Sequence, residues 1–372
     1  MNKKEIAEIK KLLLPTKETI SRIAGCYVSA EKEKITTFNK SFGLLEEEEV
    51  FKYLEIFRKS LSGTVGKNLM DMIFPDEEEN EGGKQEFLYR LRQSHLEDDA
   101  LLEQFYDKVI EGYVTPENYL ILLIANAYDV PGKGTDRLEM FDASEEVYDY
   151  FQAVICPVDL AKPALSYDRE QASFRSRDRD WVVGMPAVGI LFPSFNGRGN
   201  DIHSCLYYSK DSEDLHFDFT DALFGCQAPL SAGLQKEAFD LMVEQSLGEK
   251  CDFETVKEIH EVLLEREEEH QDDPDPDNLG VSDVRVILSK AGVLADDMQS
   301  LEEAYEENVG KDGTLLASNV RAKAKFEVHT PDVTITVSRD RTDLVETKMI
   351  DGRKCIVIPI TDEVLVNGIH VR

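Results

Sequence analysis

Hydrophobic residues recur at helical spacing in three segments of the N-terminal third. Over 2–14 Ile6, Ile9 and Leu13 fall on one face, and Asn2 and Glu5 have the spacing of a capping box. Over 45–63 acidic residues lie near the N-terminal end and basic residues near the C-terminal end, an order that the helix dipole favours. A third amphipathic stretch covers 98–113. The pattern predicts a helix in each segment.

Runs of β-branched and aromatic residues predict strands. The first run alternates over 19–29, and two longer runs at 118–130 and 147–160 are bounded by turn residues, which is typical of central strands. Two further runs cover 179–195 and 201–210. These strands follow one another without regular intervening helices, which favours an antiparallel sheet.

The spacing becomes helical again after Ser212. Strongly periodic segments at 231–249 and 252–270 predict two helices. Residues 266–280 are charged, contain Pro and Gly, and have no apolar residue before Leu279, so they are predicted to be an acidic linker.

The remainder is predicted to hold two short helices and then a β-rich tail. The tail alternates polar and apolar residues, and Asp351-Gly352 has the composition of a hairpin turn between two apolar runs. Runs of strands and runs of helices together predict an α+β fold. We expect a main α+β domain over 1–265, the linker 266–280 and a small C-terminal α/β unit over 281–372.

Charge limits the partners that the protein can bind. The 372 residues include 42 Lys and Arg but 74 Asp and Glu, which gives a formal net charge of −32. An acidic field repels phosphate backbones and the anionic face of a membrane. Nucleic acid is therefore a disfavoured partner unless basic residues are concentrated on one face, and no membrane association is expected.

Cysteine use and the N-terminal sequence favour a cytoplasmic protein. The six cysteines are scattered and no two form a C-x-x-C pair, so neither a metal knuckle nor a redox motif is supported. The charged first residues do not resemble a signal peptide, and no apolar run approaches about 18 residues. We expect reduced thiols, no metal and no cofactor.

Three short motifs resemble ligand sites but depart from their patterns. Residues 62–68 lack the spacing and the hydroxyl residue of a phosphate-binding loop, and 273–284 lacks the Gly and Glu of a calcium loop. His260 has no potential metal ligand three or four residues away. Residues 62–68 are better explained as a turn and 273–284 as part of an acidic linker. His260 is better explained as a residue at the edge of an apolar helix face.

A row of arginines is the sharpest candidate binding site. Arg175, Arg177 and Arg179 stand at period two, so on a strand they would share one face, and Arg198 in a glycine-rich turn could join them. Arginine forks bind carboxylates and phosphates. This pattern predicts an anion-binding ridge. The alternative is a salt-bridged sheet surface, because acidic residues are interleaved with the arginines.

The stretch FPSFNGRGNDIHSCLYYSK, residues 192–210, is interpreted as a hairpin turn with polar residues close by. It supplies Asp201 and His203, which could serve as acid–base groups. An enzyme acting on a phosphorylated or nucleotide substrate, with the arginines as a clamp, is therefore an alternative to a binding role. No G-x-S-x-G elbow and no recognisable nucleophilic cysteine supports it.

Several phrases resemble a known bacterial family. MNKKEIAEIKK, CYVSAEKEK, FKYLEIFRKSLSGTVGKNL and WVVGMPAVGILFPSFNGRGNDIHSCLYYSK are similar to the family described as domain of unknown function 4317, over nearly the whole chain. The resemblance implies a cytoplasmic bacterial protein and implies no particular activity.

A second resemblance covers part of the latter half. The segment DALFGCQAPLSAGLQKEAFDLMVEQSL is loosely similar to a region of the 37-kilodalton nucleoid-associated protein family, carried by Phe224, Gly225 and Cys226. It implies association with DNA, for which a basic patch is needed. Arg321, Lys323 and Lys325, at period two, are the small basic cluster in that half.

The sequence favours binding over catalysis, because no catalytic constellation is complete. We expect a soluble, non-enzymatic binding or assembly protein, in one form nucleoid-associated-like, whose partner is a protein or an anionic ligand.

Overall fold

The computed structural model divides into two compact units, each described by itself. It describes residues 1–371 except 18, 134–138, 177–178, 227–228, 312, 322–324, 361–363 and 367–368. The first unit is Met1–Ala232 with Pro274–Pro276, and the second is Gly233–Asp273 with Asp277–Arg372. Among the described residues, no helix has both the length and the apolar content needed to cross a membrane.

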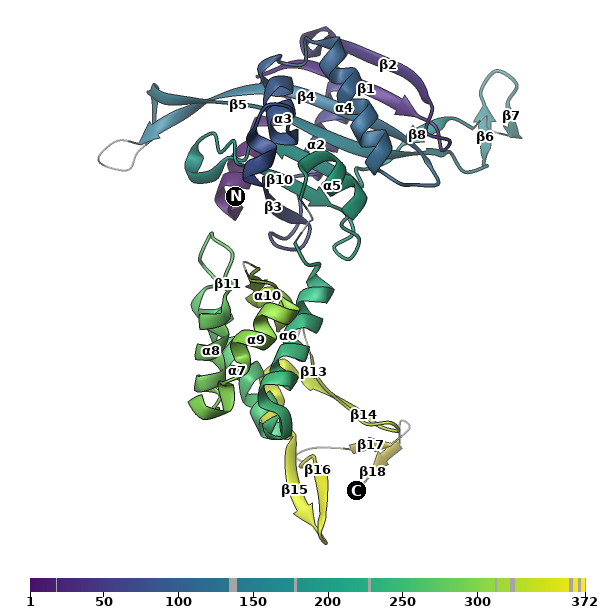
Figure 1. Ribbon diagram of the computed structural model, residues 1–372. Helices are drawn as coiled ribbons and strands as arrows, with labels where there is room; N and C mark the ends of the chain where they lie inside the picture. The colour runs from purple at the N-terminus through teal and green to yellow at the C-terminus, as the bar shows by residue number, and fades with distance from the viewer. Residues whose placement is uncertain are drawn as a thin grey trace. The chain divides into compact units, whose positions relative to one another are not determined.

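An antiparallel sheet is the centre of the first unit (Figure 1). The described strands follow the order β2-β1-β4-β5-β9-β10-β3, and β8 also pairs with β5. This architecture confirms the predicted α+β class. The strands are β1 (Ile20–Val28), β2 (Lys34–Ser41), β3 (Leu69–Ile73), β4 (Asn118–Lys133), β5 (Glu139–Leu160), β8 (Trp181–Val183), β9 (Val188–Phe192) and β10 (Ser204–Ser209).

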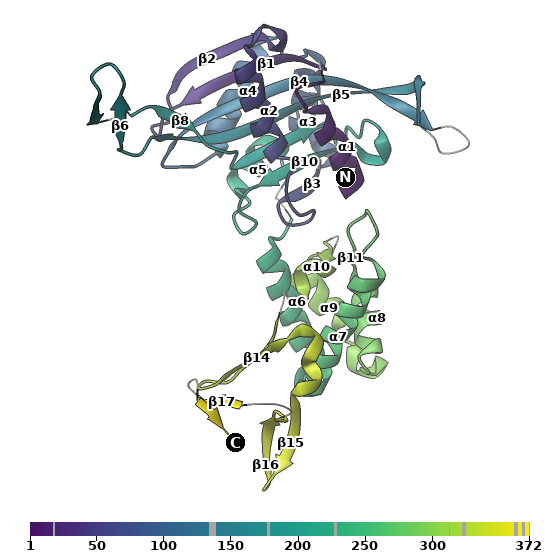
Figure 2. The same cartoon turned by 180° about the vertical axis from the view of Figure 1, so that it is seen from behind.

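Helices cover both faces of this sheet (Figures 1 and 2). Ile121 and Leu123 of β4 join the core beneath one set of helices, whereas Leu122 and Ile124 join the core beneath the other. Because successive strand residues point to opposite faces, two buried faces require a continuous apolar run, and β4 has one. The first set is α3 (Lys84–Gln93), α4 (Asp99–Gly112) and α5 (Phe217–Phe224); the second is α1 (Lys3–Leu12) and α2 (Glu47–Lys59).

The predicted N-terminal capping box is confirmed. The Asn2 side chain accepts from the backbone N–H groups of Lys4 and Glu5, and the Glu5 carboxylate accepts from the Asn2 N–H. The helices predicted over 45–63 and 98–113 are α2 and α4. Residues 76–85 contain a short 3₁₀ turn and the start of α3.

The second unit is a helical cluster with a core of its own. Phe239 and Met242 pack with Leu263, Ile287 and other buried residues. The helices are α6 (Ala232–Leu247), α7 (Phe253–Glu269), α8 (Val281–Lys290), α9 (Leu301–Asn308) and the single turn α10 (Ala317–Val320).

The division between units falls at residue 232 rather than near the expected 265. Helices α6 and α7 bury their apolar faces against α8, so they belong with the C-terminal unit. Part of the predicted linker is also ordered. Arg266, in the last turn of α7, donates to both carboxylate oxygens of Asp277, at 2.8 and 2.7 Å, and β11 (Asn278–Leu279) pairs with β12 (Leu315–Leu316).

The chain ends in a series of two-stranded ribbons. The predicted turn at Asp351-Gly352 is confirmed. Asp351 and Gly352 have φ angles of 49° and 76°, and the turn joins two paired antiparallel strands. A similar two-stranded ribbon, β6 (Leu165–Asp168) with β7 (Ser173–Ser176), occurs in the first unit. The C-terminal ribbons are β13 (Lys325–His329) with β14 (Thr334–Ser338), β15 (Glu346–Ile350) with β16 (Arg353–Val357), and β17 (Val364–Val366) with β18 (Ile369–Val371).

Candidate functional site

The predicted arginine row lies around the β6–β7 ribbon. Arg175 lies on β7, is mostly exposed, and its Nε is 3.2 Å from the carboxylate of Asp168. Strand β7 ends at Ser176, so Arg179 lies beyond it and does not share its face. Arg179 Nε donates instead to the backbone carbonyl of Ala161 at 2.6 Å. Arg177 lies outside the described residues.

Arg198 is held far from that ribbon. It lies in the turn between β9 and β10, where its Nη2 donates to Glu8 at 2.9 Å and its Nη1 to the Pro131 carbonyl at 3.3 Å. Pro131 pairs with Ser144, whereas Arg179 contacts Leu160 as well as Ala161. Residues 144 and 160 are separated along β5 by roughly 50 Å at about 3.3 Å per residue. Arg198 therefore does not join the other arginines.

Asp201 and His203 are engaged in the hydrogen bonds of their own turn. Asp201 accepts from Asn196 and Ser204, both at 2.6 Å, and from the His203 N–H at 3.1 Å. Partial burial works to raise the Asp201 pKa, but the hydrogen bonds from Ser204 and Asn196 bring it below its ordinary value. This segment joins β9 to β10, so the hairpin interpretation is confirmed.

His203 forms an exposed pair with an acid. Its Nδ1 lies 2.7 Å from Glu79, and this hydrogen bond raises the pKa of the imidazole. Cys205, two residues on, is fully buried, and burial raises the pKa of its thiol well above the ordinary value. A buried, protonated thiol is a poor nucleophile, so the structure offers no support for Cys205 as a nucleophile.

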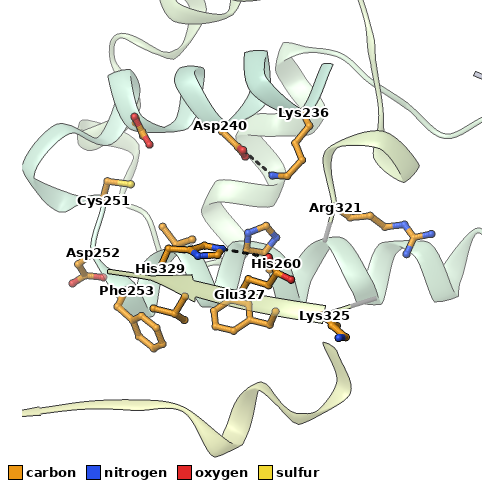
Figure 3. Close-up of a pocket in the computed structure, with 14 residues that line it drawn as sticks. Lys236, Asp240, Cys251, Asp252, Phe253, His260, Arg321, Lys325, Glu327 and His329 are labelled. Atoms are coloured by element: carbon orange, nitrogen blue, oxygen red, sulfur yellow. Dashed lines mark hydrogen bonds and ion pairs between the residues drawn. The ribbon is translucent and has the colours of Figure 1, made fainter. Parts of the chain in front are cut away.

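A groove of about 1010 Å³ lies in the second unit (Figure 3). Phe326 lines the groove and packs edge-on against His260, with ring centroids 6.1 Å apart. No local sequence pattern indicates this groove, because β13 lies far along the chain from α6 and α7. Helix α6 supplies Lys236, Asp240 and Glu244, α7 supplies Phe253, Val256 and His260, and β13 supplies Lys325, Phe326, Glu327, Val328 and His329, with Cys251, Asp252 and Arg321 completing the lining.

Charges within this groove largely compensate one another. Lys236 is paired with Asp240 at 2.7 Å, and His329 lies 3.3 Å from Glu327 (Figure 3). Arg321 Nη2 is 2.6 Å from Glu267, although its Nε and Nη1 are buried without a partner among the described residues. Burial, followed by the neighbouring Lys236, lowers the pKa of His260. The groove thus has no strong net charge with which to select an ion.

The basic cluster predicted near residue 321 is likewise partly neutralised. Arg321 pairs with Glu267, Lys325 lies exposed on β13, and Lys323 lies outside the described residues. No group of three or more His, Cys, Asp or Glu in the described part of the chain is placed to hold one metal ion.

The C-terminal ribbons expose apolar side chains, which is the feature that sequence reasoning missed. Met349 on β15 and Ile369 on β18 are 68 and 71% exposed, and Ile360, which lies between β16 and β17, is 77% exposed. The alternation of polar and apolar residues predicts these strands, but the exposure of their apolar side chains is evident only in the structure. Val333, Ile350, Ile358 and Val366 are further exposed apolar residues of the tail.

The described residues form an antiparallel α+β unit, a helical unit and a series of two-stranded ribbons. The chain matches the family described as domain of unknown function (DUF4317) over residues 1–369. It belongs to that family. No curated protein matches the chain, and no solved structure matches it. The likeness to nucleoid-associated proteins gains no support from these comparisons and stays a hypothesis.

Proposed function

We propose that the protein is a non-enzymatic binding or assembly protein, whose copies associate through the tail, defined as residues 325–371. The observation that carries this proposal is the pair of ribbons β15–β16 and β17–β18, whose strands expose the apolar side chains of Met349, Ile350, Val366 and Ile369. Ribbons of two strands are marginally stable alone in water and are normally completed by further strands or by a packed helix.

Burial of the tail against another chain would be favourable. Covering one exposed side chain such as Met349 or Ile360 contributes about 1.5–3 kcal/mol. The ribbon edges also present backbone N–H and C=O groups that can pair with an added strand. Strand addition together with apolar burial supports association through this segment.

The distribution of charge favours a second copy of the chain as the partner that covers the tail. The tail contains 6 basic and 8 acidic residues, whereas the rest of the chain contains 36 basic and 66 acidic residues. Two copies that approach through the rest of the chain repel each other strongly, and a basic partner is drawn to that acidic part. The nearly balanced tail is where two identical molecules meet with least repulsion.

The proposal retains the bacterial cytoplasm that the family resemblance implies. All six cysteines are free thiols, in keeping with a reducing compartment. The catalytic alternative lacks an assembled set of groups among the described residues, because Asp201 and His203 bind their own turn and Glu79.

Sedimentation equilibrium of the wild type and two matched variants tests the proposal. Met349→Glu places a carboxylate opposite Lys354, its cross-strand neighbour in the same ribbon. The attraction between these opposite charges should preserve the pairing of the two strands. Leu294→Glu is the control, because Leu294 is also 68% exposed, lies in the second unit and is outside the tail.

We expect the wild type to self-associate and Met349→Glu to weaken the association by about tenfold or more, from the lost apolar burial. Leu294→Glu should associate as the wild type does. A wild type that stays monomeric up to about 0.1 mM, well above a micromolar Kd, contradicts the proposal. Equal weakening by both variants also contradicts it.

A further inference from the structure

A second groove, of about 750 Å³, lies in the first unit and has a different electrostatic character. It is bounded by α1 and α2, which lie on the same face of the sheet (Figure 2). Four cationic side chains line it, and one carboxylate, that of Glu55, is found among its lining residues. The cations are Lys10, Lys52, Arg58 and Lys59, and together they define the basic groove.

These cations lack the acidic partners that basic residues such as Lys34, Arg198 and Arg266 have. None of the four forms an ion pair with a carboxylate of the described residues. This is unexpected in a chain with 74 acidic and 42 basic residues, where random placement would favour compensation. The basic groove is therefore an electropositive site on an acidic molecule.

Helix dipoles account for only part of this arrangement. Lys10 lies in the last turn of α1, and Arg58 and Lys59 lie in the last turn of α2, where cations are favoured by about 0.3–1 kcal/mol each. That preference explains basic residues at each helix end. It does not explain why the two ends converge, since convergence brings like charges together.

The cost of convergence is visible at Lys10. Burial and then the charges of Arg58 and Lys59 lower the pKa of its ammonium group. Lys10 also donates to the hydroxyl of Ser62, which in turn donates to the Arg58 carbonyl at 2.7 Å. The Ser62 hydroxyl thus orients the Lys10 ammonium group, and both residues line the groove.

We propose that the basic groove binds a small ligand through a phosphoryl group. A dianionic phosphate or a diphosphate matches four cations and one carboxylate better than a single carboxylate ligand does. Exposed Phe51 and Met185 also line the groove and offer contact to an apolar part of the ligand. The site is independent of the tail and of the arginines at the β6–β7 ribbon.

Isothermal titration calorimetry on the full chain, in phosphate-free buffer of low ionic strength, tests the proposal with pyrophosphate as the probe. Phenyl phosphate and phenylacetate are compared in parallel to distinguish a phosphoryl from a carboxylate ligand. The variants are Arg58→Gln and the more exposed Lys59→Gln, which remains informative if the first does not fold. Lys4→Gln is the control, because Lys4 is an exposed residue of α1 outside the groove and its loss changes the net charge equally.

We expect pyrophosphate binding in the wild type and in Lys4→Gln, and a loss of about tenfold in affinity in each groove variant. Phenyl phosphate should bind more tightly than phenylacetate. The proposal is overturned if pyrophosphate does not bind at millimolar concentration, or if Lys4→Gln and Lys59→Gln lose affinity equally. Tighter binding of a single-stranded oligonucleotide than of pyrophosphate also overturns it, in favour of a nucleic-acid site.

Discussion

Two histidines show how environment sets the sign of a residue's response to pH. His260 lies on α7 and packs against the Phe326 ring, and its buried Nδ1 has no partner among the described residues. Burial first, and then the charge of Lys236, lower its pKa, while Asp240 acts in the opposite direction. His203 is exposed, and its hydrogen bond to Glu79 raises its pKa.

The lowered pKa of His260 predicts a loss of stability in mild acid. Below the ordinary value of 6.5 the unfolded chain takes up a proton at this residue that the folded chain does not, so the free energy of unfolding falls as pH decreases. His260→Gln should remove this contribution. Urea unfolding of both proteins at a pH above and a pH below 6.5 measures the difference.

His203→Gln serves as the comparison, because a raised folded pKa has the opposite sign. Protonated His203 stabilises the folded state below its unfolded pKa, and that contribution is lost as pH rises through the folded pKa. The variant should lose a little stability in acid only, since the residue is exposed. An unchanged acid response in His260→Gln would show that this imidazole does not control it.

Local turns could be predicted from the sequence, whereas the long-range contacts of individual side chains could not. The turn at 192–210 and the Asp351-Gly352 turn follow from local chemistry, and both are present. Arg198 instead finds Glu8, 190 positions earlier, which local spacing cannot reveal. The basic groove has a readable signal, a basic residue in the last turn of each helix, but the sequence does not show that the two helix ends meet.

Helices and strands were located correctly from the sequence where their buried residues form a clear hydrophobic pattern. Strands β4 and β5 are long and apolar, and α1 carries its capping box, so all three were located. Strand β2 is half exposed and largely polar, and β3 has only five residues, so neither gives a clear pattern. Helix α7 was predicted, but the unit to which it belongs depends on contacts with residues distant in the sequence, such as those of α8.

The contact between α4 and α5 depends on a glycine. A Cβ on Gly112 would lie 2.8 Å from the Ala222 Cβ and 2.9 Å from the Phe219 Cα. Gly112→Ala should therefore destabilise the protein by about 1–3 kcal/mol, because the backbone of α5 must shift. Denaturant unfolding followed by circular dichroism measures the change.

Gly43→Ala is the matched control for that substitution. A Cβ at Gly43 meets no atom within 4 Å, and its backbone does not have a positive φ. We expect a change within about 0.5 kcal/mol, or a slight gain from reduced freedom of the unfolded chain. If both variants behave alike, the close approach of α4 to α5 does not limit stability.

For the whole molecule, the −32 charge is the property that links the two proposals. The negative charge opposes contact between copies everywhere except at the nearly neutral tail. It also contrasts with the four cations of the basic groove. Each proposal depends on a different force. Association through the tail rests on apolar burial opposed by long-range repulsion, whereas the basic groove rests on attraction between opposite charges.

These forces respond to salt in opposite directions, which gives the last prediction. Raising NaCl from about 0.05 to about 0.5 M shortens the Debye length from roughly 14 to 4 Å and screens the repulsion between acidic molecules. Self-association of the wild type should strengthen, while pyrophosphate binding should weaken. Sedimentation equilibrium and calorimetry on the same preparations measure both.

Met349→Glu separates the two effects. It should remain weakly associated at either salt concentration, because screening cannot replace the lost apolar contact, yet it should keep the salt-sensitive binding of pyrophosphate. If association of the wild type instead weakens with salt, contacts between arginines and acids hold the copies together. The exposed ribbon with Arg175, rather than the tail, would then be the surface to test.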